Sequence, residues 1–374
     1  MSTEICFKVG RMNYKILKVS PSKRRMFDLI VDFITAPIVN PDLSAKIRQI
    51  ATDAVEKSPK KGNIRAYEYE HFPSKSLLYD YLFAIGEKQI FGTEIDDILK
   101  LLEEKWLIHN DYTHKVDMGG LKDQEYVINA GYIQFLHQNN LLYSYLLGFE
   151  YICEHFSRSV FKIEVSINGQ RSLGTGWIID YIHESGRTRL VVTNHHVIEN
   201  ADWIKIWDSS DNEIRYHDIE DFSRENHDVA FLKVDYEAET PDFTITESYG
   251  ILDEVVTLGY PTIPQARDAF QVAHRGEINS LIDDYWGKKL LVVSARTAPG
   301  NSGSPVINDQ GLVIGMITKE LFEKEAFTEK GITPYSACIP SEIIGSLLDK
   351  SAIIAKEKEK NSNHTSEGFP ASPN

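Results

Sequence analysis

The sequence predicts an α+β protein of several domains, with a mainly helical N-terminal half and an all-β half after it. Up to about residue 155, apolar residues recur at spacings of three and four, which is typical of amphipathic helices. From about residue 160, short segments rich in β-branched residues alternate with turns, which is typical of a barrel or sandwich. The 374 residues exceed one ordinary domain. We expect regions at 1–65, 70–155 and 158–350, and a disordered tail at 356–374.

Composition and charge narrow the classes of function. The net charge of −15 disfavours binding to nucleic acid, which requires clustered lysine and arginine. No apolar run approaches the ~20 residues that span a bilayer, and the N-terminus has an acid where a signal peptide has bases. The sequence therefore predicts a cytoplasmic protein with no membrane partner. Cys6, Cys153 and Cys338 are far apart without metal-binding spacing, so we predict free thiols, no metal and no cofactor.

The first region, residues 1–65, is predicted to hold a hairpin and two helices. The strands Ile5–Val9 and Tyr14–Val19 flank a plausible turn. Apolar spacing then predicts a helix over Arg25–Thr35. A second helix is expected from Asn40, a capping residue followed by proline, to about Lys57. These patterns assign no role to the region.

Residues 70–155 carry a pattern of helix, helix, β-wing and helix. The helices are expected at Leu77–Ile85 and after a capping box formed by Thr93 and Asp96. The second helix has one apolar stripe, made of Ile95, Ile98, Leu99, Leu102 and Trp106. A strand at Tyr126–Ile128 and a helix from Ala130 follow. This order resembles a winged helix-turn-helix domain.

The charge of this region indicates what such a domain can bind. Residues 75–137 contain six lysines, eleven acids and no arginine, a net charge of −5. A DNA-reading helix needs a basic surface, so we favour contacts with a regulatory protein or another signal. A helical cap on the second domain is the alternative. The apolar segment Leu141–Cys153 is too short to span a membrane, and we predict a buried helix at a domain junction.

The β-rich half places a histidine, an aspartate and a serine in suggestive contexts. Strands are expected at 161–167, 176–182, 190–193, 203–207, 229–234, 254–258, 290–294 and 313–318. His195 and His196 end one apolar strand, and Asp228 opens another. Ser302 lies in the glycine-rich turn Gly300-Asn-Ser-Gly303. Each feature alone is ordinary at a strand end, but together they have the order and contexts of a nucleophilic triad.

These motifs carry a family resemblance. Thr193-Asn-His-His-Val197, Asn226-His-Asp-Val-Ala230 and Gly300-Asn-Ser-Gly-Ser-Pro-Val306 resemble the His, Asp and Ser motifs of chymotrypsin/trypsin-like serine proteases. They are most similar to the bacterial glutamyl-endopeptidase and HtrA-type branches. Gly174-Thr-Gly, Leu258-Gly-Tyr-Pro261 and Cys338-Ile-Pro-Ser341 add support. The resemblance covers about 158–350 and implies two six-stranded β-barrels, an active site between them, and a C-terminal helix.

The resemblance assigns roles residue by residue. His196, which directly precedes a valine, becomes the general base for Ser302, and Asp228 orients its imidazole. The backbone N–H groups of Gly300 and Ser302 become the oxyanion hole, each worth roughly 3–4 kcal/mol in the transition state. The activity implied is that of a serine endopeptidase acting on protein or peptide substrates.

The resemblance also gives three candidate substrate-pocket residues. Thr297 matches a pocket residue of the glutamyl endopeptidases, but their pocket histidine falls at Ile317. An apolar residue there removes the partner for a buried substrate carboxylate, whereas Arg296 is close enough to restore an acidic preference if it faces the pocket. We favour a medium-sized apolar side chain at the cleaved bond.

The sequence also bears on regulation and leaves two alternative functions open. Residues 158–164 do not resemble the new N-terminus that trypsin-type zymogens release. We therefore hypothesise that the N-terminal half receives a signal and orders the loops at 265–273 and 297–301. The alternatives are a protease-fold binding module without catalysis, and a DNA-binding regulator that cleaves itself. The acidic balance disfavours the second.

Overall fold

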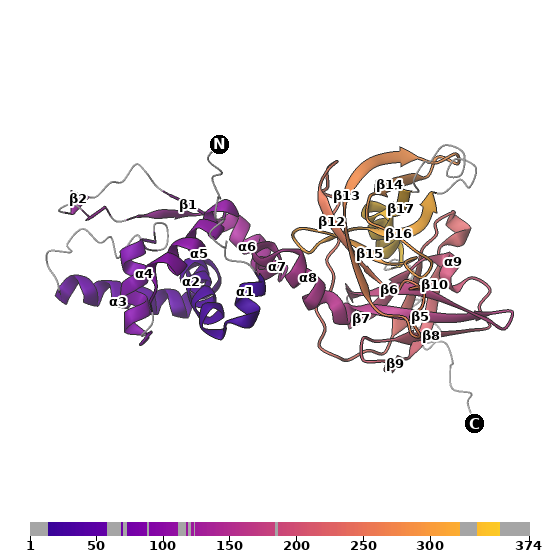
Figure 1. Ribbon diagram of the computed structural model, residues 1–374, viewed down its shortest axis with the longest axis horizontal. Coiled ribbons are helices and arrows are strands. Elements are labelled where there is room, and N and C mark those ends of the chain that lie inside the picture. The colour runs from indigo at the N-terminus through magenta and orange to yellow at the C-terminus, as the bar shows by residue number, and fades with distance from the viewer. Residues whose placement is uncertain are drawn as a thin grey trace, which may run out of the picture. The chain divides into compact units, whose positions relative to one another are not determined.

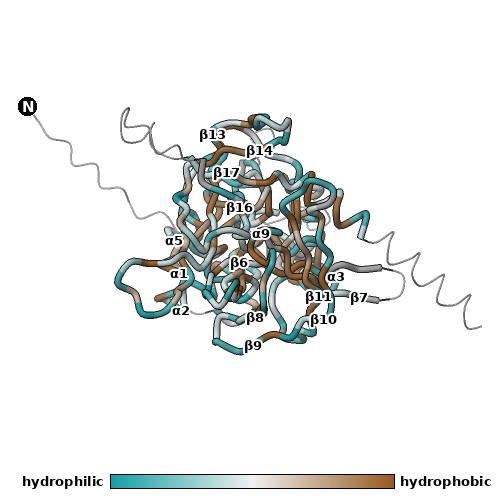
Figure 2. The backbone as a smooth tube through the Cα atoms, turned by 90° about the vertical axis from the view of Figure 1, so that its right-hand side faces the viewer, coloured by the Kyte–Doolittle hydropathy of each residue, from teal (hydrophilic) through white to brown (hydrophobic). Residues whose placement is uncertain are grey.

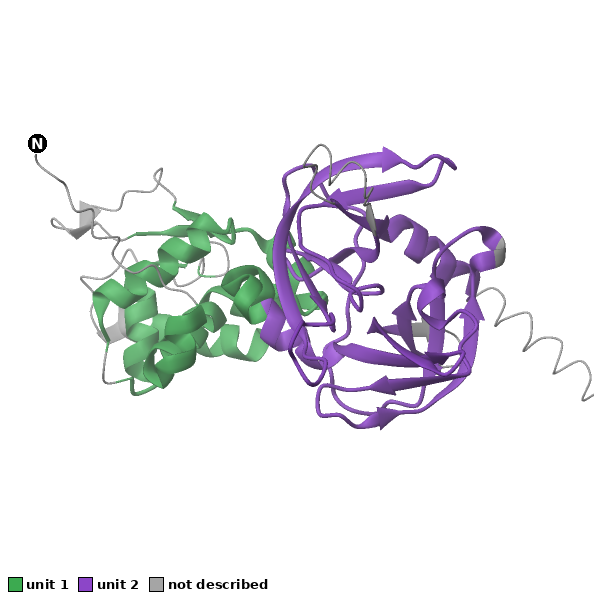
Figure 3. Ribbon diagram, turned by 45° about the vertical axis from the view of Figure 1, so that its right-hand side comes forward, with its two compact units in different colours: residues 1–151 green, residues 152–374 purple. Residues whose placement is uncertain are grey.

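The computed structural model describes residues 14–57, 69, 73–87, 90–110, 117–118, 121–122, 124–183, 186–321 and 335–351. The chain forms two compact units, residues 1–151 and 152–374 (Figure 3). None of the helices in the described part of the chain has the length and apolar character needed to cross a lipid bilayer.

Helices dominate the first unit. They are α1 (Tyr14–Val19), α2 (Pro21–Val39), α3 (Pro41–Lys57), α4 (Lys75–Ala84), α5 (Gly92–Glu104), α6 (Ala130–Gln138), α7 (Leu142–Leu147) and the start of α8 (Phe149–Phe156). The central helix is α2, which contacts α1, α3, α4, α5 and α6 (Figure 1). Its inward face, with Phe27, Ile30 and Phe33, is at most 1% exposed. This burial explains why one helix organises the unit.

The predicted N-terminal hairpin is wrong where the structure describes it. Tyr14–Val19 is the helix α1, not a strand, because it buries Leu17 and packs against α2. The other predicted strand, Ile5–Val9, and its turn lie outside the described residues. The two predicted helices that follow are confirmed as α2 and α3. Asn40 caps the second, and its Oδ1 accepts the N–H of Leu43 at 3.1 Å.

The capping box predicted at Thr93 is also wrong. Helix α5 already begins at Gly92, and its N-cap Phe91 makes no side-chain capping hydrogen bond. Four members of the predicted stripe are buried, but Trp106 is 71% exposed, because the helix ends at Glu104 and Trp106 turns with φ 58°.

The strands of the predicted wing are present. The strand β1 (Ile108–Asn110) pairs antiparallel with β4 (Tyr126–Ile128), and β2 (Asp117–Met118) pairs with β3 (Leu121–Lys122). The order of elements agrees with the expected one, but the winged-helix assignment stays a prediction. The single helix expected over Leu141–Cys153 is instead split into α7 and α8 by Gly148, whose φ is +72°.

The second unit holds two antiparallel sheets. The first contains β5 (Val160–Ile167), β6 (Gln170–His183), β7 (Gly186–Thr193), β8 (Trp203–Trp207), β9 (Glu213–Ile214), β10 (Tyr216–Asp221) and β11 (Ala230–Val234). Its order is β10-β11-β7-β6-β5-β8-β9. Within the described residues it is an open seven-stranded sheet, not the closed six-stranded barrel expected. Only Arg215 separates the edge strands β9 and β10, and one residue is too short for a hairpin turn.

The second sheet is the closed barrel that was predicted. It contains β12 (Glu254–Gly259), β13 (Val272–Asp283), β14 (Lys289–Val293), β15 (Pro305–Asn308), β16 (Val313–Leu321) and β17 (Tyr335–Pro340). The strands close in the order β12-β13-β14-β17-β16-β15, and a helix over 341–351 follows. Hydrophobic positions gather on strands of both sheets, including β6, β11 and β16 (Figure 2). Each sheet has its own buried cluster, with Phe161 and Val191 in the first and Leu291 and Val306 in the second.

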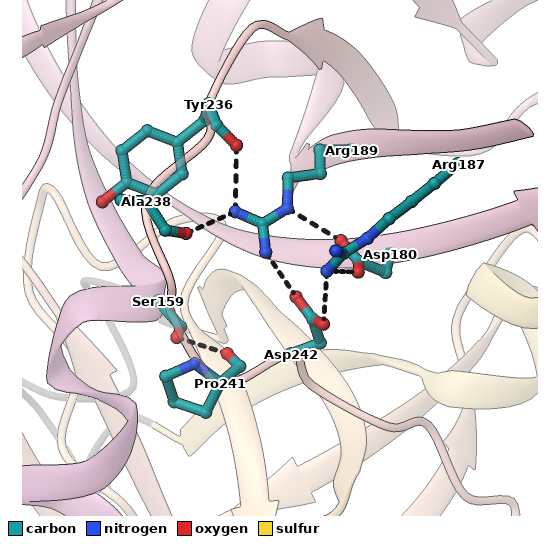
Figure 4. A network of polar contacts seen from close by, with 8 residues as sticks. All are labelled: Ser159, Asp180, Arg187, Arg189, Tyr236, Ala238, Pro241 and Asp242. Carbon is teal, nitrogen blue, oxygen red and sulfur yellow. Dashed lines mark hydrogen bonds and ion pairs between the residues drawn. The ribbon is translucent and has the colours of Figure 1, made fainter.

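An arginine fastens the segment that connects the two sheets (Figure 4). Arg189 of β7 is 11% exposed, and its Nε donates to Oδ1 of Asp180 at 3.0 Å. Its Nη1 donates to the backbone carbonyls of Tyr236 and Ala238 at 2.9 and 2.7 Å, and Asp242 completes the network. Because each of these donors is satisfied, the guanidinium tolerates burial and holds the connection against the first sheet.

Candidate active site

His196 stands on a single helical turn at the end of β7. This turn, α9 (His195–Ile198), is anchored by Val197 and Ile198, which are 6% and 8% exposed and belong to the core of the first sheet. Asn194 precedes the turn, and its Nδ2 donates to the backbone carbonyl of Asp228 at 3.0 Å. The imidazole of His196 stays 43% exposed. The fold thus holds the backbone firmly and leaves the ring open to a substrate.

Asp228 meets His196 because their strands are neighbours. Strand β11 pairs with β7 in a register that places Ala230 opposite Thr193. The carboxylate accepts the backbone N–H of His196 on Oδ1 at 2.9 Å, and Nδ1 of His196 lies 2.8 Å from Oδ2. A carboxylate at Nδ1 favours the tautomer protonated there, which leaves Nε2 as the basic nitrogen.

A third contact to Asp228 comes from the second sheet. Oγ1 of Thr318, on β16, donates to Oδ2 of Asp228 at 2.5 Å. Burial alone raises the pKa of this carboxyl, but the hydrogen bonds and charge of His196 and the hydroxyl of Thr318 outweigh it, so the pKa lies below its usual value. Asp228 therefore stays ionised. Sequence reasoning missed Thr318, because a threonine inside an apolar strand carries no signal of this contact.

Two glycines shape the turn around Ser302. Gly300 has φ +101°, and a side chain there would meet the carbonyl oxygen of Tyr260 at 2.4 Å. Gly303 has φ +89°, and a side chain there would meet the carbonyl oxygen of Thr175 at 1.9 Å. Only glycine suits both the dihedral angle and the space at these positions.

Thr175, from the first sheet, clamps the same turn. Its backbone N–H donates to the carbonyl of Ser302 at 2.8 Å, and its Oγ1 donates to the carbonyl of Gly300 at 2.7 Å. Its Oγ1 in turn accepts the N–H of Tyr260 at 3.0 Å. The side chain of Thr175 is fully buried. The sequence marked the Gly174-Thr-Gly segment as part of the resemblance, but did not assign this clamp.

The backbone N–H groups of Gly300 and Ser302 have no acceptor among the residues that the structure describes. The carbonyls just before them, of Pro299 and Asn301, accept the N–H groups of Thr262 at 2.8 Å and Ser304 at 2.9 Å. In a trans peptide the C=O and N–H point in opposite directions, so both N–H groups are turned away from these partners. Neither donates to an acceptor within the described part of the chain. They can therefore bind a developing oxyanion.

The hydroxyl of Ser302 is hydrogen-bonded to Thr318. Its Oγ donates to the carbonyl oxygen of Thr318 at 3.2 Å, and no hydrogen bond joins it to His196 among the described residues. A change of the χ1 rotamer is the motion that moves Oγ between such positions.

The three candidate pocket residues lie in different environments. Ile317 is 1% exposed and belongs to the core of the barrel, so its side chain is not open to a substrate, contrary to expectation. Oγ1 of Thr297 lies 3.0 Å from Oγ of Ser336. Because Ser336 donates to the carbonyl of Ala295 at 2.7 Å, Thr297 is the donor in the first contact. Arg296 is exposed and has no partner among the described residues.

A cavity of about 320 Å³ lies beside the oxyanion turn. It is lined by Glu164, Arg171, Ser172, Leu173, Thr262, Pro299 and Gly300. It gives a bound molecule space next to Gly300. No group of three or more His, Cys, Asp or Glu residues within the described ranges is placed to hold a metal ion.

Part of the chain is similar to known proteins. A family model described as a trypsin-like peptidase domain matches residues 174–316, which include all three motifs. Residues 174–316 form a trypsin-like peptidase domain. The match runs from within β6 to within β16, so it includes the turn of His196, the strand after Asp228 and the turn of Ser302.

Two curated relatives match part of the chain. One is an uncharacterised protein, y4bJ, of Sinorhizobium fredii, 29% identical over 166 residues, which are 44% of this chain and 24% of the relative. The other is a probable periplasmic serine endoprotease, DegP-like, of Chlamydia trachomatis, 29% identical over 185 residues, which are 46% of this chain and 34% of the relative. The chain thus spans about a quarter and about a third of these relatives.

Solved structures of proteases also align with the chain. The active form of the Rv3671c protease of M. tuberculosis is 21% identical, with a TM-score of 0.43, and the alignment covers 53% of this chain and 83% of that one. An HtrA-type protease solved with a tripeptide is 20% identical, with a TM-score of 0.43, covering 54% and 63%.

Proposed function

We propose that the chain is a serine endopeptidase that hydrolyses peptide bonds through an acyl-enzyme. The observation that carries the proposal is the convergence of an aspartate-bound imidazole with a serine turn whose two N–H groups have no acceptor among the described residues. In the reaction, Ser302 leaves the carbonyl of Thr318 and turns to Nε2 of His196. Its Oγ attacks the substrate carbonyl while His196 takes the proton, and Asp228 stabilises the imidazolium. The N–H groups of Gly300 and Ser302 bind the oxyanion.

His196 then gives its proton to the leaving amine, which breaks the peptide bond and leaves an ester on Ser302. Water, deprotonated by the same imidazole, hydrolyses that ester and restores the hydroxyl. The rotation of Ser302 also frees the carbonyl of Thr318, which can then accept an N–H from the bound peptide. One carbonyl oxygen thus serves the resting serine and the bound substrate in turn.

The test uses a fluorophosphonate probe, which reacts only with an activated serine. We expect labelling of the full chain at Ser302 and hydrolysis of peptides, both abolished in Ser302→Ala. The melting temperature of the variant serves as the control for folding. Turnover retained by Ser302→Ala would disprove the assignment.

One observation favours a second function, a protease-fold binding module without catalysis. The hydroxyl of Ser302 is bound to Thr318 instead of His196 in this structure. The same probe separates the two, because a silent module stays unlabelled however well it is folded.

We further propose that the first unit is a regulatory module that binds a protein or another signal. The acids at the start of α5 have lysine partners: Glu94 lies 3.4 Å from Lys23, and Asp96 lies 2.5 Å from Lys75. Lysines that are paired with acids in this way offer little positive charge to the phosphates of DNA. Comparing the cleavage rate of fragment 155–355 with that of the full chain tests the proposal. Equal rates under all conditions would contradict it.

A further inference from the structure

A second cavity opens beside the catalytic aspartate. It has a volume of about 460 Å³, and both Asp228 and Thr318 line it. The remaining walls are residues 225–227, residues 284 and 286–288 of the turn between β13 and β14, Lys289 and Leu290 at the start of β14, Lys319, Ile339 and Ile343. Because Asp228 and Thr318 also belong to the hydrogen-bond network of the site, a peptide held at Ser302 passes near this cavity.

The cavity combines an apolar floor with an aromatic rim. Leu290 and Ile339 are 5% and 6% exposed, so they present little surface except toward the cavity. Trp286 is 75% exposed at the tip of the hairpin. A large aromatic ring left open beside a cavity offers contact area to a bound side chain.

Three lysines line the cavity, and its acids are already engaged. Asp284 accepts the backbone N–H groups of Trp286 and Lys288, both at 2.9 Å, and its Oδ2 lies 4.0 Å from Nζ of Lys319. Glu225 forms an ion pair with Lys350.

Asp228, the remaining acid in the wall, is bound to His196 and Thr318. By contrast, the amines of Lys288 and Lys289 have no carboxylate partner among the described residues. Two amines in the lining are therefore available to pair with a carboxylate from outside, although the chain as a whole carries a net charge of −15.

The pKa of a neighbouring histidine is lowered by burial and by nearby lysines. His227 lines the cavity, and burial together with the positive charge of Lys350 and Lys288 lowers its pKa, against the opposite effect of Glu225. A neutral His227 leaves the lysines as the charged donors facing the cavity. Such an arrangement is complementary to a carboxylate.

We propose that this cavity is a substrate subsite that takes an acidic side chain two to four residues from the cleaved bond, with Lys288 as the residue that recognises it. The carboxylate pairs with the Lys288 amine while the methylenes of the same side chain lie against Trp286 and Leu290. The inference rests on the proposed endopeptidase function. It concerns a position different from the residue at the cleaved bond, which Arg296 and Thr297 adjoin.

The test is a cleavage profile of the full-length protein on a peptide library. We expect Asp and Glu to be preferred over Asn and Gln at one position two to four residues from the cut, by about fivefold, as for a partly exposed ion pair. Lys288→Gln removes this preference, and Lys288→Glu turns it toward Lys and Arg at the same position. The preference also weakens as salt is raised.

Lys46→Glu is the matched control, because it makes the same change of charge at an exposed site on α3 and retains the wild-type profile. An unchanged profile in Lys288→Glu would overturn the subsite. Fluorophosphonate labelling of each protein separates this result from failure of the proposed function. Labelled, active protein without an acidic preference refutes the subsite alone, whereas wild-type protein that neither reacts nor cleaves refutes the peptidase and the subsite with it.

Discussion

Two adjacent histidines each face an aspartate, yet the two pairs are built differently. Asp228 receives two contacts from His196, 32 positions away, and one from Thr318, 90 positions away. Nδ1 of His195 lies 2.8 Å from Oδ1 of Asp221, but it makes no aligned hydrogen bond. Asp221 instead accepts both the N–H and the hydroxyl of Ser223, two positions away, at 2.7 and 3.0 Å.

The comparison teaches that a histidine and an aspartate are not enough to make a catalytic pair. What matters is whether residues far apart in the chain hold the carboxylate against the ring. The carboxylate of Asp221 already accepts two hydrogen bonds from Ser223 in its own turn, so it lies near His195 without orienting that ring. Asp228 is held from both sheets, and its carboxylate is aimed at the ring that stays open to a substrate. The two rings also differ in exposure, 43% for His196 and 19% for His195.

The largest effect that separates the pairs is expected from removing each histidine. His196→Ala should lower kcat/KM on a peptide by about 10⁴-fold, because in the proposed mechanism it removes the general base and acid. His195→Ala should lower it less than about threefold, within the range of a surface substitution. Steady-state kinetics on one substrate measures both. Comparable losses would mean that the two histidines share the reaction.

A smaller effect is expected from Thr318→Val, which keeps the shape of the side chain but removes its hydrogen bond to Asp228. We expect kcat/KM to fall by about tenfold, as for loss of a hydrogen bond to a charged group. The lowered pKa of Asp228 stabilises the fold above the usual carboxyl pKa, and this contribution is lost as the pH falls through the lowered value.

Without Thr318 that pKa rises, so the acid unfolding midpoint moves to higher pH. Fluorescence-detected unfolding as a function of pH measures this shift. A fall in rate with no shift of the midpoint would show that the threonine does not act through Asp228.

The smallest effect is expected from Asp221→Asn. Its carboxylate is 39% exposed and accepts mainly from Ser223, so the free energy of unfolding should change by less than about 1 kcal/mol, and kcat/KM should stay within twofold of wild type. Urea unfolding and peptide kinetics are the measurements. A tenfold loss of activity would place the second pair inside the catalytic machinery.

Sequence reasoning was most accurate where periodicity is strong and local. The strands expected at 161–167, 203–207 and 313–318 appear as β5, β8 and β16, because alternation or a short apolar run is read directly from the residues. It failed for Tyr14–Val19, whose six residues form α1 only because Leu17 packs against α2. Short segments adopt the secondary structure that their tertiary contacts stabilise.

The site shows the same division. His196, Asp228, Gly300 and Ser302 were predicted because each stands in a motif that can be recognised without a structure. Thr175 and Thr318 were not assigned, since a buried threonine in a strand looks the same whether or not it holds a distant group. Ile317 was placed in the pocket by position alone, and the strand turns it into the core.

By itself the sequence determined the types and order of the histidine, the aspartate and the serine of the candidate site. Glycines around a serine, and polar residues at the ends of apolar strands, can be recognised from a short stretch of sequence. Only the tertiary structure decided how Asp228 reaches His196, which threonines hold the site together and where the hydroxyl of Ser302 rests. Those outcomes depend on the register of β7 with β11 and on the approach of the two sheets. Both are set by contacts between residues far apart in the chain, which a local pattern does not record.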